Sequence, residues 1–252
     1  MSTRLEGGTQ RRPGANSKAP LLSILVVIFN ARPRLPELLE SIFRQKADDV
    51  ELVVIDGGSH DGTLEYLCTH EDQIDYWLSE PDRGIYDAMN KAVARATGTF
   101  LLHLNIGDAL VEIPREELER TRNTNVVLLS FPVELSTKRT FRPSYGIGLR
   151  FSNTLHHQGT FYRRSIFPVY DIALKVFADF DVNQRLALSG AQEFIGQRVV
   201  AYHETDGVSA QRSVEKIAEF RSIVRKNYGR GALAIACILG KWRGLRAKVS
   251  IV

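Results

Sequence analysis

The chain has 252 residues, of which 44% are hydrophobic and 25% are charged, a composition typical of an α/β protein with a substantial core. Its two cysteines, Cys68 and Cys237, are far apart and have no partner motif, which argues against a disulfide framework or a cysteine zinc site. No run of about 18 apolar residues occurs and residues 1–20 lack the apolar core of a secretory signal, so we expect a cytoplasmic protein without a spanning helix.

The formal net charge of +4 is distributed unevenly along the chain. Residues 221–252 contain eight Lys or Arg and no acid, whereas residues 1–20 contain four Lys or Arg and one acid. Subtracting +8 and +3 from +4 leaves −7 for residues 21–220. An acidic body argues against nucleic-acid binding, while the basic C-terminal segment predicts contact with an anionic surface such as a membrane.

Short apolar runs alternate with helical periodicity along the first half of the chain. In order, the pattern predicts a strand at 21–29, a helix at 33–45, a strand at 50–55, a helix from near Asp61, a strand at 74–79, a helix at 85–96 ended by Gly98 as its C-cap, and a strand at 99–105. Such alternation predicts an α/β fold with a mainly parallel sheet covered by helices on both faces. Ligands of such sheets bind at the carboxyl ends of the strands.

The second half of the chain is less regular. It predicts a helix at 114–122, a strand at 126–132, β-like hairpins to about 155, a helix at 178–189, a strand at 197–203 and a helix at 213–227. We therefore expect a disordered leader at 1–20, one domain at 21–228 with a smaller β-rich side, and a basic amphipathic helix at 229–252. The alternative for that last helix is packing of its apolar stripe on the domain.

A glycine-rich segment, DGGSHDGT at 56–63, follows the strand at 50–55 directly. Glycines such as Gly58 permit positive φ and close backbone approach to a ligand, and Asp56 at the strand end can accept hydrogen bonds from a base or ribose. The alternative is a turn in which Asp61 caps the next helix. The segment contains neither GxGxxG nor GxxxxGK[ST], which disfavours Rossmann dinucleotide and P-loop interpretations.

Two further segments place charged side chains where the sheet is expected to end. SEPDRGIYDAMNK at 79–91 gathers Asp82, Arg83 and Asp87 at a helix start, where Asp87 could also complement the helix dipole or pair with Lys91. The strand at 99–105 is followed by Asp108, and a carboxylate there suits a hard cation that bridges a diphosphate. A simple turn at 105–108 is the alternative.

Taken together, DGGSxDGT, SEPDRGIYDAMNKA and NxGD resemble the motifs of family 2 inverting glycosyltransferases, closest to bacterial enzymes of surface polysaccharide and glycolipid synthesis. The resemblance implies a GT-A fold in which Asp108 is the metal-binding acid of a degenerate DxD motif and Mg²⁺ or Mn²⁺ is the cofactor. It assigns the donor site to Asn30, Asp56, Gly58, Asp82, Arg83, Asp87, Asn90 and His157.

The resemblance also implies a general base in the stretch ADFDVNQR at 178–185. Asp179 aligns with the family's base and Asp181 is the second candidate. His157, in the sequence HHQ at 156–158, is a candidate contact for the donor phosphate or the metal, although a histidine satisfied within a turn is the alternative. The loop 203–209 resembles one that closes over the site in relatives, with a strand-to-helix turn as the alternative.

The sequence thus predicts a transferase that moves a sugar from a nucleotide sugar, preferably a UDP-sugar, to a glycan or lipid-linked acceptor at the inner face of the cell membrane. One alternative is a non-catalytic, membrane-associated binding protein of glycosyltransferase-like fold. Another is a nucleotidyltransferase. That class should carry a Gly-rich, basic loop after the first strand, where this chain has Phe29-Asn30-Ala31-Arg32-Pro33.

Overall fold

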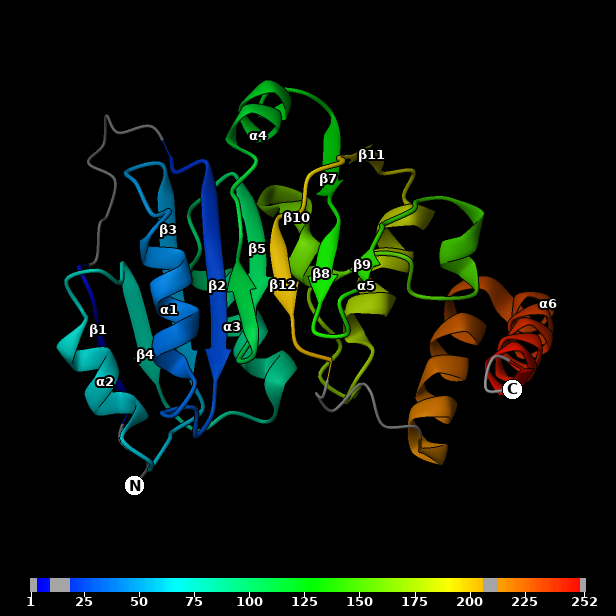
Figure 1. The fold of residues 1–252 in the computed structure, drawn as a ribbon, viewed down its shortest axis with the longest axis horizontal. Coiled ribbons are helices and arrows are strands. Elements are labelled where there is room, and N and C mark those ends of the chain that lie inside the picture. Colours follow the sequence, from blue (N-terminus) through cyan, green and yellow to red (C-terminus); the bar gives the residue numbers. More distant parts are fainter. Residues whose placement is uncertain (1–3, 10–18, 206–212, 250–252) are drawn as a thin grey trace.

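The computed structural model describes residues 4–9, 19–205 and 213–249 and contains two sheets (Figure 1). The large sheet has the order β1 (Leu5–Gly7), β4 (Tyr76–Ser79), β3 (Val50–Asp56), β2 (Leu22–Ile28), β5 (Phe100–Leu104), β10 (Thr160–Arg163), β7 (Val126–Ser130) and β11 (Gln192–Ile195). The small sheet has the order β6 (Asp108–Leu110), β12 (Ala201–His203), β8 (Val133–Leu135) and β9 (Thr140–Phe141). The expected α/β fold with a smaller β-rich side is confirmed.

Helices cover the sheets and fill the second half of the chain. They are α1 (Leu35–Phe43), α2 (Thr63–Thr69), α3 (Ile85–Arg95), α4 (Arg115–Thr121), α5 (Ala178–Leu188) and α6 (Val214–Val249), with 3₁₀ turns η1 (Ile147–Arg150), η2 (His157–Gly159) and η3 (Arg164–Ile166). The helix α6 lies at the opposite end of the molecule from β1 (Figure 1).

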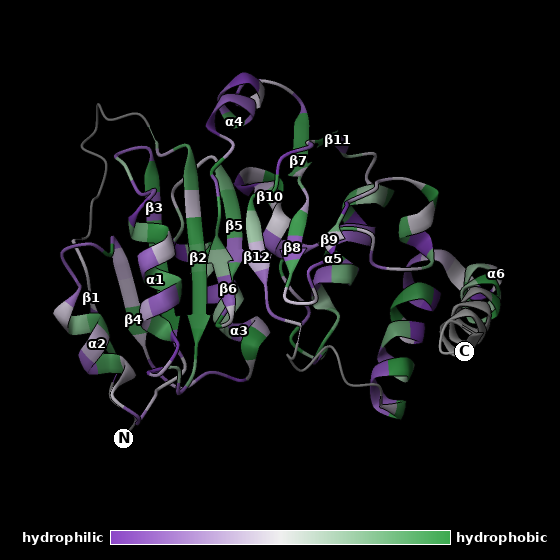
Figure 2. Cartoon of the chain, in the orientation of Figure 1, coloured by the Kyte–Doolittle hydropathy of each residue, from purple (hydrophilic) through white to green (hydrophobic). Residues whose placement is uncertain are grey.

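The core lies on both faces of the large sheet because its central strands are apolar on both sides. All seven residues of β2 are buried, and Figure 2 shows this strand as almost continuously hydrophobic. Ile24 packs in the cluster that contains the buried residues of α1, and Leu25 packs in the cluster that contains those of α3. Successive side chains of a strand point to opposite faces, so α1 and α3 cover opposite faces of the sheet.

The parallel pairing of β4, β3, β2 and β5 aligns their carboxyl ends. Ile28 of β2 lies opposite Asp56 of β3, which lies opposite Ser79 of β4. The polar segments that follow these strands therefore meet at one edge of the sheet, which is where ligands of open α/β sheets bind.

Three local expectations are corrected by the structure. The expected disordered leader contains β1, which pairs antiparallel with β4 through Leu5 and Ser79, while residues 10–18 lie outside the described part of the chain. The C-cap of α3 is Ala96, and Gly98 instead permits close approach to Ser23, whose backbone nitrogen would lie 2.6 Å from an added Cβ. The N-cap of α2 is Gly62 at φ 90°, a backbone conformation that favours glycine.

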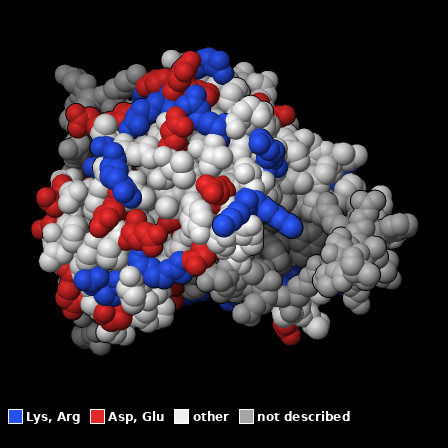
Figure 3. All heavy atoms as spheres, in the orientation of Figure 1, with Lys and Arg blue, Asp and Glu red and all other residues white. Residues whose placement is uncertain are grey.

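The long helix α6 is interrupted at Gly229, whose φ of 81° and ψ of −176° are not helical. This kink falls where we expected the C-terminal helix 229–252 to begin. No helix within residues 4–9, 19–205 and 213–249 combines the length and apolarity needed to cross a membrane. On the face seen in Figure 3, acidic and basic side chains are intermingled over the described residues, without a continuous basic stripe.

Candidate active site

A cavity of about 680 Å³ opens at the carboxyl edge of the large sheet. Its walls come from the end of β2, the start of α3, the segment after β5, the turn η2, the start of α5 and the end of β12. The cavity therefore lies between the first half of the chain and the second.

Asp108 is buried at the cavity wall and is held by three donors. Its Oδ2 accepts hydrogen bonds from the backbone N–H of Asn105 (2.7 Å) and from Nε2 of Gln158 (2.9 Å), and its Oδ1 pairs with Nδ1 of His203 (2.7 Å). Asp108 is the first residue of β6, and the register of β6 with β12 places it opposite His203. The small sheet therefore brings this histidine to the predicted metal-binding acid.

The residues around Asp108 fit a divalent ion held by one protein carboxylate. A carboxylate offers about four lone-pair positions, and three are used here. Oε1 of Gln158 is buried and has no hydrogen-bond partner among the described residues, so oxygen acceptors remain at this point. Within the described chain no group of three or more His, Cys, Asp or Glu could hold a metal by itself. An ion here would take its other ligands from water and a substrate diphosphate, as Mg²⁺ commonly does.

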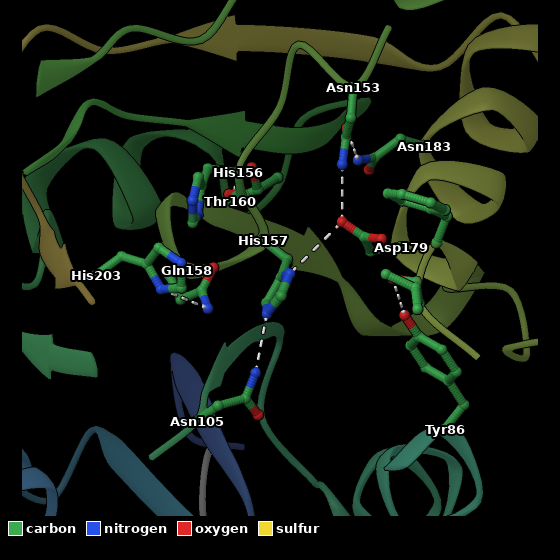
Figure 4. A network of polar contacts seen from close by, with 12 residues as sticks. Tyr86, Asn105, Asn153, His156, His157, Gln158, Thr160, Asp179, Asn183 and His203 are labelled. Carbon is green, nitrogen blue, oxygen red and sulfur yellow. Dashed lines mark hydrogen bonds and ion pairs between the residues drawn. The ribbon is translucent and has the colours of Figure 1, made fainter. Parts of the chain in front are cut away.

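Asp179 lines the cavity from the first turn of α5. Its Oδ2 accepts a hydrogen bond from Nδ2 of Asn153 (2.8 Å) and lies 3.6 Å from Nδ1 of His157 (Figure 4). Burial opposes ionisation of this carboxyl group, but its contact with His157 and the bonds from Phe180 and Asn153 prevail and lower its pKa. Asp179 is therefore an ionised carboxylate that faces the space where a substrate could bind.

Asp181 lies away from the cavity despite being only two residues further along. Its side chain is fully buried, and its oxygens contact Nε of Arg185 at 2.9 Å and Nδ2 of Asn227 at 3.1 Å. Asp181 therefore ties α5 to α6, and the structure gives no support to its choice as second candidate for the base.

The predicted donor residues Asp56, Gly58 and Asn30 meet at the sheet edge, where Asp56 and Asn30 form hydrogen bonds with residues of neighbouring loops. The fully buried Asp56 accepts hydrogen bonds from the backbone and hydroxyl of Ser59 and from the hydroxyl of Ser79 (2.6 Å). Asn30 accepts from the backbone N–H of His60 (3.1 Å), and Gly58 has a φ of 83°. These residues shape the edge, and none of the three lines the cavity in this structure.

Asp82, Arg83 and Asp87 form a local cluster before and within the first turn of α3. The backbone and side chain of Arg83 donate to Asp87, each at 3.0 Å. Burial opposes ionisation of Asp87, but the bonds from Arg83 outweigh it and lower its pKa. Oδ2 of Asp82 lies so close to Gly57 that an added Cβ would meet it at 2.7 Å. The cluster orders this loop beside the predicted donor edge.

Asn90 is engaged elsewhere. Its Nδ2 donates to the backbone oxygen of Tyr170 (3.0 Å), and its Oδ1 accepts from the Tyr170 backbone N–H (2.9 Å). Both ends of this amide therefore join α3 to the loop before α5. Asn90 thus has a structural role in this contact, and its predicted contact with the sugar donor stays a prediction.

Sequence reasoning missed several residues that line the cavity. Gln158 and Tyr86 line it, and so do the cations Arg34 and Lys175. Arg34 forms an ion pair with Glu204, and both side chains lie against Gly107, whose φ is 93°. The HHQ sequence and the expected loop 203–209 were signals for part of this set, although residues 206–209 lie outside the described part of the chain. The two cations had no signal, because isolated Arg and Lys are ordinary surface residues.

Comparison with known proteins adds independent information. Residues 23–121 match the model of glycosyl transferase family 2. The chain is 33% identical over 206 residues, 76% of this chain and 80% of the relative, to a PGL/p-HBAD biosynthesis glycosyltransferase of Mycobacterium bovis. It is 25% identical over 130 residues, 49% of this chain and 38% of the relative, to the uncharacterized glycosyltransferase EpsJ of Bacillus subtilis.

Two solved structures resemble the fold. S. aureus TarS 1-349 in complex with UDP-GlcNAc has a TM-score of 0.65 at 17% identity, covering 82% of this chain and 66% of that one. The mannosyltransferase PcManGT from Pyrobaculum calidifontis, in complex with GDP-Man and Mn²⁺, has a TM-score of 0.58 at 17% identity, covering 95% and 82%. Against the longer TarS chain, this protein spans 38% of the length.

Proposed function

The chain belongs to glycosyl transferase family 2, and from that premise we propose that it is an inverting, metal-dependent enzyme with a UDP-sugar donor and Asp179 as general base. The observation that carries the proposal is the position of Asp179. It is an ionised carboxylate in the wall of the cavity that Asp108 also lines. A base must face the reacting atoms, and Asp181, which is fully buried against Arg185, does not.

The proposed reaction is a single displacement. Asp179 accepts the proton of an acceptor hydroxyl while that oxygen forms a bond to the anomeric carbon of the donor and the bond to the diphosphate breaks. Attack from the side opposite the leaving group inverts the configuration. A positioned general base of this kind contributes roughly 10²- to 10⁴-fold to a rate.

The charges of the departing diphosphate require compensation at the other side of the cavity. A divalent ion at Asp108 would supply Lewis-acid stabilisation of those charges. Arg34 and Lys175 line the same cavity and are the cations best placed to add to it. Arg34 would have to exchange its ion pair with Glu204 for the diphosphate. The cavity thus combines a base with groups for the leaving group, which favours an enzyme over a non-catalytic binding protein.

The choice of a UDP-sugar is supported by the fold neighbour TarS, whose structure is described as a complex with UDP-GlcNAc, whereas PcManGT is described with GDP-Man. Isothermal titration of UDP, GDP, UDP-GlcNAc and GDP-Man, with and without Mn²⁺, tests this choice. We expect the uridine compounds to bind more tightly, with affinity rising in Mn²⁺. Preference for the guanosine compounds would refute the donor assignment, and equal affinity after chelation would refute the metal dependence.

Catalysis itself is tested by the release of UDP from the preferred donor in Mg²⁺ or Mn²⁺. Release by the wild-type protein at a rate that Asp179→Asn abolishes supports the proposal. Binding of donor without release under any condition would instead support the non-catalytic alternative.

We further propose that α6 holds the enzyme at the inner face of the cell membrane, near a lipid-linked or glycan acceptor. The apolar side chains Val214, Ile217, Ile235 and Ile238 of this helix are exposed. Arg221, Arg225 and Lys226 line a hollow of about 500 Å³ beside the kink. Apolar side chains next to cations are typical of helices that lie in a membrane interface. A relative of the chain is named for PGL/p-HBAD biosynthesis, which is compatible with a lipid-linked acceptor.

Sedimentation with vesicles tests the membrane proposal. We expect the full chain to sediment with vesicles containing phosphatidylglycerol and to be released by high salt. Replacing Arg221, Arg225 and Lys226 by Ser should weaken binding. Replacing the exposed cations Lys138, Arg139 and Arg142 by Ser is the matched control and should not. Equal loss in both triple variants would show nonspecific charge attraction and would refute α6 as the anchor.

A further inference from the structure

The turn η2 and its N-cap residue His156 carry three consecutive side chains that reach different parts of the site. The ring of His156 packs against the ring of His203 with centroids 4.7 Å apart, His157 faces Asp179, and Gln158 donates to Asp108. Figure 4 shows these side chains diverging from the turn. One short segment therefore contacts both Asp108 and Asp179, and its residues have no role yet in the proposed reaction.

The turn is rigidly placed in the structure. Oγ1 of Thr160 and the backbone N–H of Gly159 both donate to the backbone oxygen of His156, each at 2.9 Å. Gly159 lies against β8 and the residue that follows β7, since an added Cβ would meet Val133 at 2.5 Å and the backbone oxygen of Phe131 at 2.6 Å. The backbone that carries His157 is therefore held in place by the hydrogen bonds of the turn and by the packing of Gly159.

The contacts of His157 orient both ring nitrogens. Nε2 lies 3.1 Å from Nδ2 of Asn105, and an amide nitrogen can only donate, so Nε2 accepts this hydrogen bond. In the neutral ring the proton is then on Nδ1. That nitrogen faces Oδ2 of Asp179 at 3.6 Å. Asn105 thus turns the N–H of His157 toward the carboxylate, as a second-layer partner does for a histidine in many active sites.

The same oxygen of Asp179 is held from its other side. Nδ2 of Asn153 donates to Oδ2, and Oδ1 of Asn153 accepts from Nδ2 of Asn183 at 3.3 Å. Asn183 in turn accepts a hydrogen bond from the hydroxyl of Tyr162 at 2.8 Å. The contacts with His157 and Asn153 both use Oδ2 and neither uses Oδ1. These two side chains therefore hold Oδ2 and leave Oδ1 to accept a proton.

We propose that His157 is the positioning residue of Asp179, holding Oδ2 through Nδ1 while Asn105 fixes the ring, so that Oδ1 is presented to the acceptor hydroxyl. This inference rests on the proposed function, because it takes Asp179 as the general base. It replaces the expected role of His157 as a contact for donor phosphate or metal. His157 keeps the carboxylate ionised against the effect of burial and fixes its direction.

The other groups near Asp179 whose pKa is shifted by burial do not change charge near neutral pH. Burial lowers the pKa of His103 on β5 and of His156 to about 3, so both rings are neutral. Burial and the Asp179 charge raise the pKa of Tyr86 on α3, and burial chiefly raises that of Tyr162 on β10 and of Tyr170. Lys175 is an exposed cation that lines the same cavity. A change in the titration of Asp179 on replacing His157 therefore reports on their contact.

The test compares the wild-type protein with His157→Phe, which removes both nitrogens, and His157→Gln, which keeps a donor. The carboxyl ¹³C resonance of Asp179, assigned by its loss in Asp179→Asn, is titrated in protein labelled with [¹³C]aspartate. Without the histidine, the carboxylate loses a hydrogen-bonding contact and burial dominates, so the midpoint should rise by about one to two pH units, the range for losing a hydrogen bond to a charged group. His157→Gln should show a smaller rise. An unchanged midpoint in His157→Phe would overturn the proposal.

Turnover of UDP-GlcNAc, or of the nucleotide sugar found to be preferred, gives the second readout. A raised pKa leaves less ionised base as the pH falls, so the ratio of variant to wild-type kcat should decrease by about tenfold between pH 7 and pH 4.5 for a rise of about two pH units. Donor Kd should be unchanged. A ratio that is low but constant with pH would indicate a purely structural role and contradict the proposal.

His70→Phe is the matched control, because His70 stacks on Tyr66 at the end of α2, outside the residues that line the cavity. Its kcat should follow the wild type at every pH. If the wild-type protein releases no nucleoside diphosphate from any donor, the proposed function fails. The carboxyl titration still decides whether His157 controls Asp179.

Discussion

Two walls of the site, of which only the second lines the cavity with a carboxylate, use their carboxylates in different ways. The first wall is the edge formed by β3, β4 and α3, where Asp56 bonds to Ser59 and Ser79, and Asp87 bonds to Arg83. On the second wall, Asp179 is held through one oxygen by Asn153 and His157 and faces the cavity. The carboxylates of the first wall fix the shape of loops, while the carboxylate of the second is available to a substrate. Substitutions on the two walls should therefore have different consequences.

The largest effect is expected for Asp179→Asn, which removes the proposed base but keeps the shape of the side chain. Its kcat should fall by roughly 10²- to 10⁴-fold, and donor affinity should stay within about twofold, because the group acts mainly in the transition state. Steady-state release of nucleoside diphosphate and calorimetric titration of donor measure the two quantities. A fall in donor affinity with unchanged kcat would assign Asp179 to donor binding. The carboxylates of the two walls would then no longer differ in their role in the reaction.

The second effect concerns Asp108, which lines the cavity from the start of β6. In Asp108→Ala, kcat/KM in Mn²⁺ should fall on the order of a hundredfold, since the proposed ion loses its carboxylate ligand. The dependence of donor binding on Mn²⁺ should disappear in the same variant. Asn105→Ala should retain that dependence. Wild-type behaviour of Asp108→Ala at saturating donor would exclude this residue as the ligand.

A smaller effect is expected on the first wall from Asp56→Asn. The carboxylate now accepts hydrogen bonds from a backbone N–H and from hydroxyl groups. In the variant an amide NH₂ group, itself a donor, would face one or more of these donors, so a buried hydrogen bond is lost. The free energy of unfolding should fall by about 1–3 kcal/mol, measured by urea denaturation. Donor affinity should weaken while kcat at saturating donor changes little. A loss of kcat as large as in Asp179→Asn would show that this wall also takes part in chemistry.

The smallest effect is expected for Asp181→Asn, the neighbour of the proposed base. Its hydrogen bond from Asn227 can be kept, whereas the pairing with Arg185 is weakened. Stability should fall by about 1 kcal/mol in urea denaturation, and kcat should remain near the wild-type value. If kcat falls more than in Asp179→Asn, Asp181 is the base and the assignment of the second wall is reversed.

The sequence motifs indicated which residues lie at the sheet edge but not which of them face a ligand. Asp56, Asp82 and Asp108 were found because parallel strands place their carboxyl ends at one edge, which is a property of the chain pattern. The pattern could not say that Asp56 would be fully buried or that Asn90 would bond to Tyr170, 80 residues away. Whether a polar side chain faces a ligand or another loop depends on packing between segments distant in sequence.

The sequence by itself determined the α/β fold, the order of its first strands and the family, because apolar periodicity and three motifs at strand ends are local features. Only the tertiary structure separated Asp179 from Asp181, since two residues along a helix place side chains on different sides. It also decided that the HHQ turn contacts both Asp108 and Asp179, because β6 and α5 meet there, although Asp108 precedes Gln158 by 50 residues and Asp179 follows His157 by 22. Such contacts arise from the folding of the chain as a whole and leave no periodic signal in it.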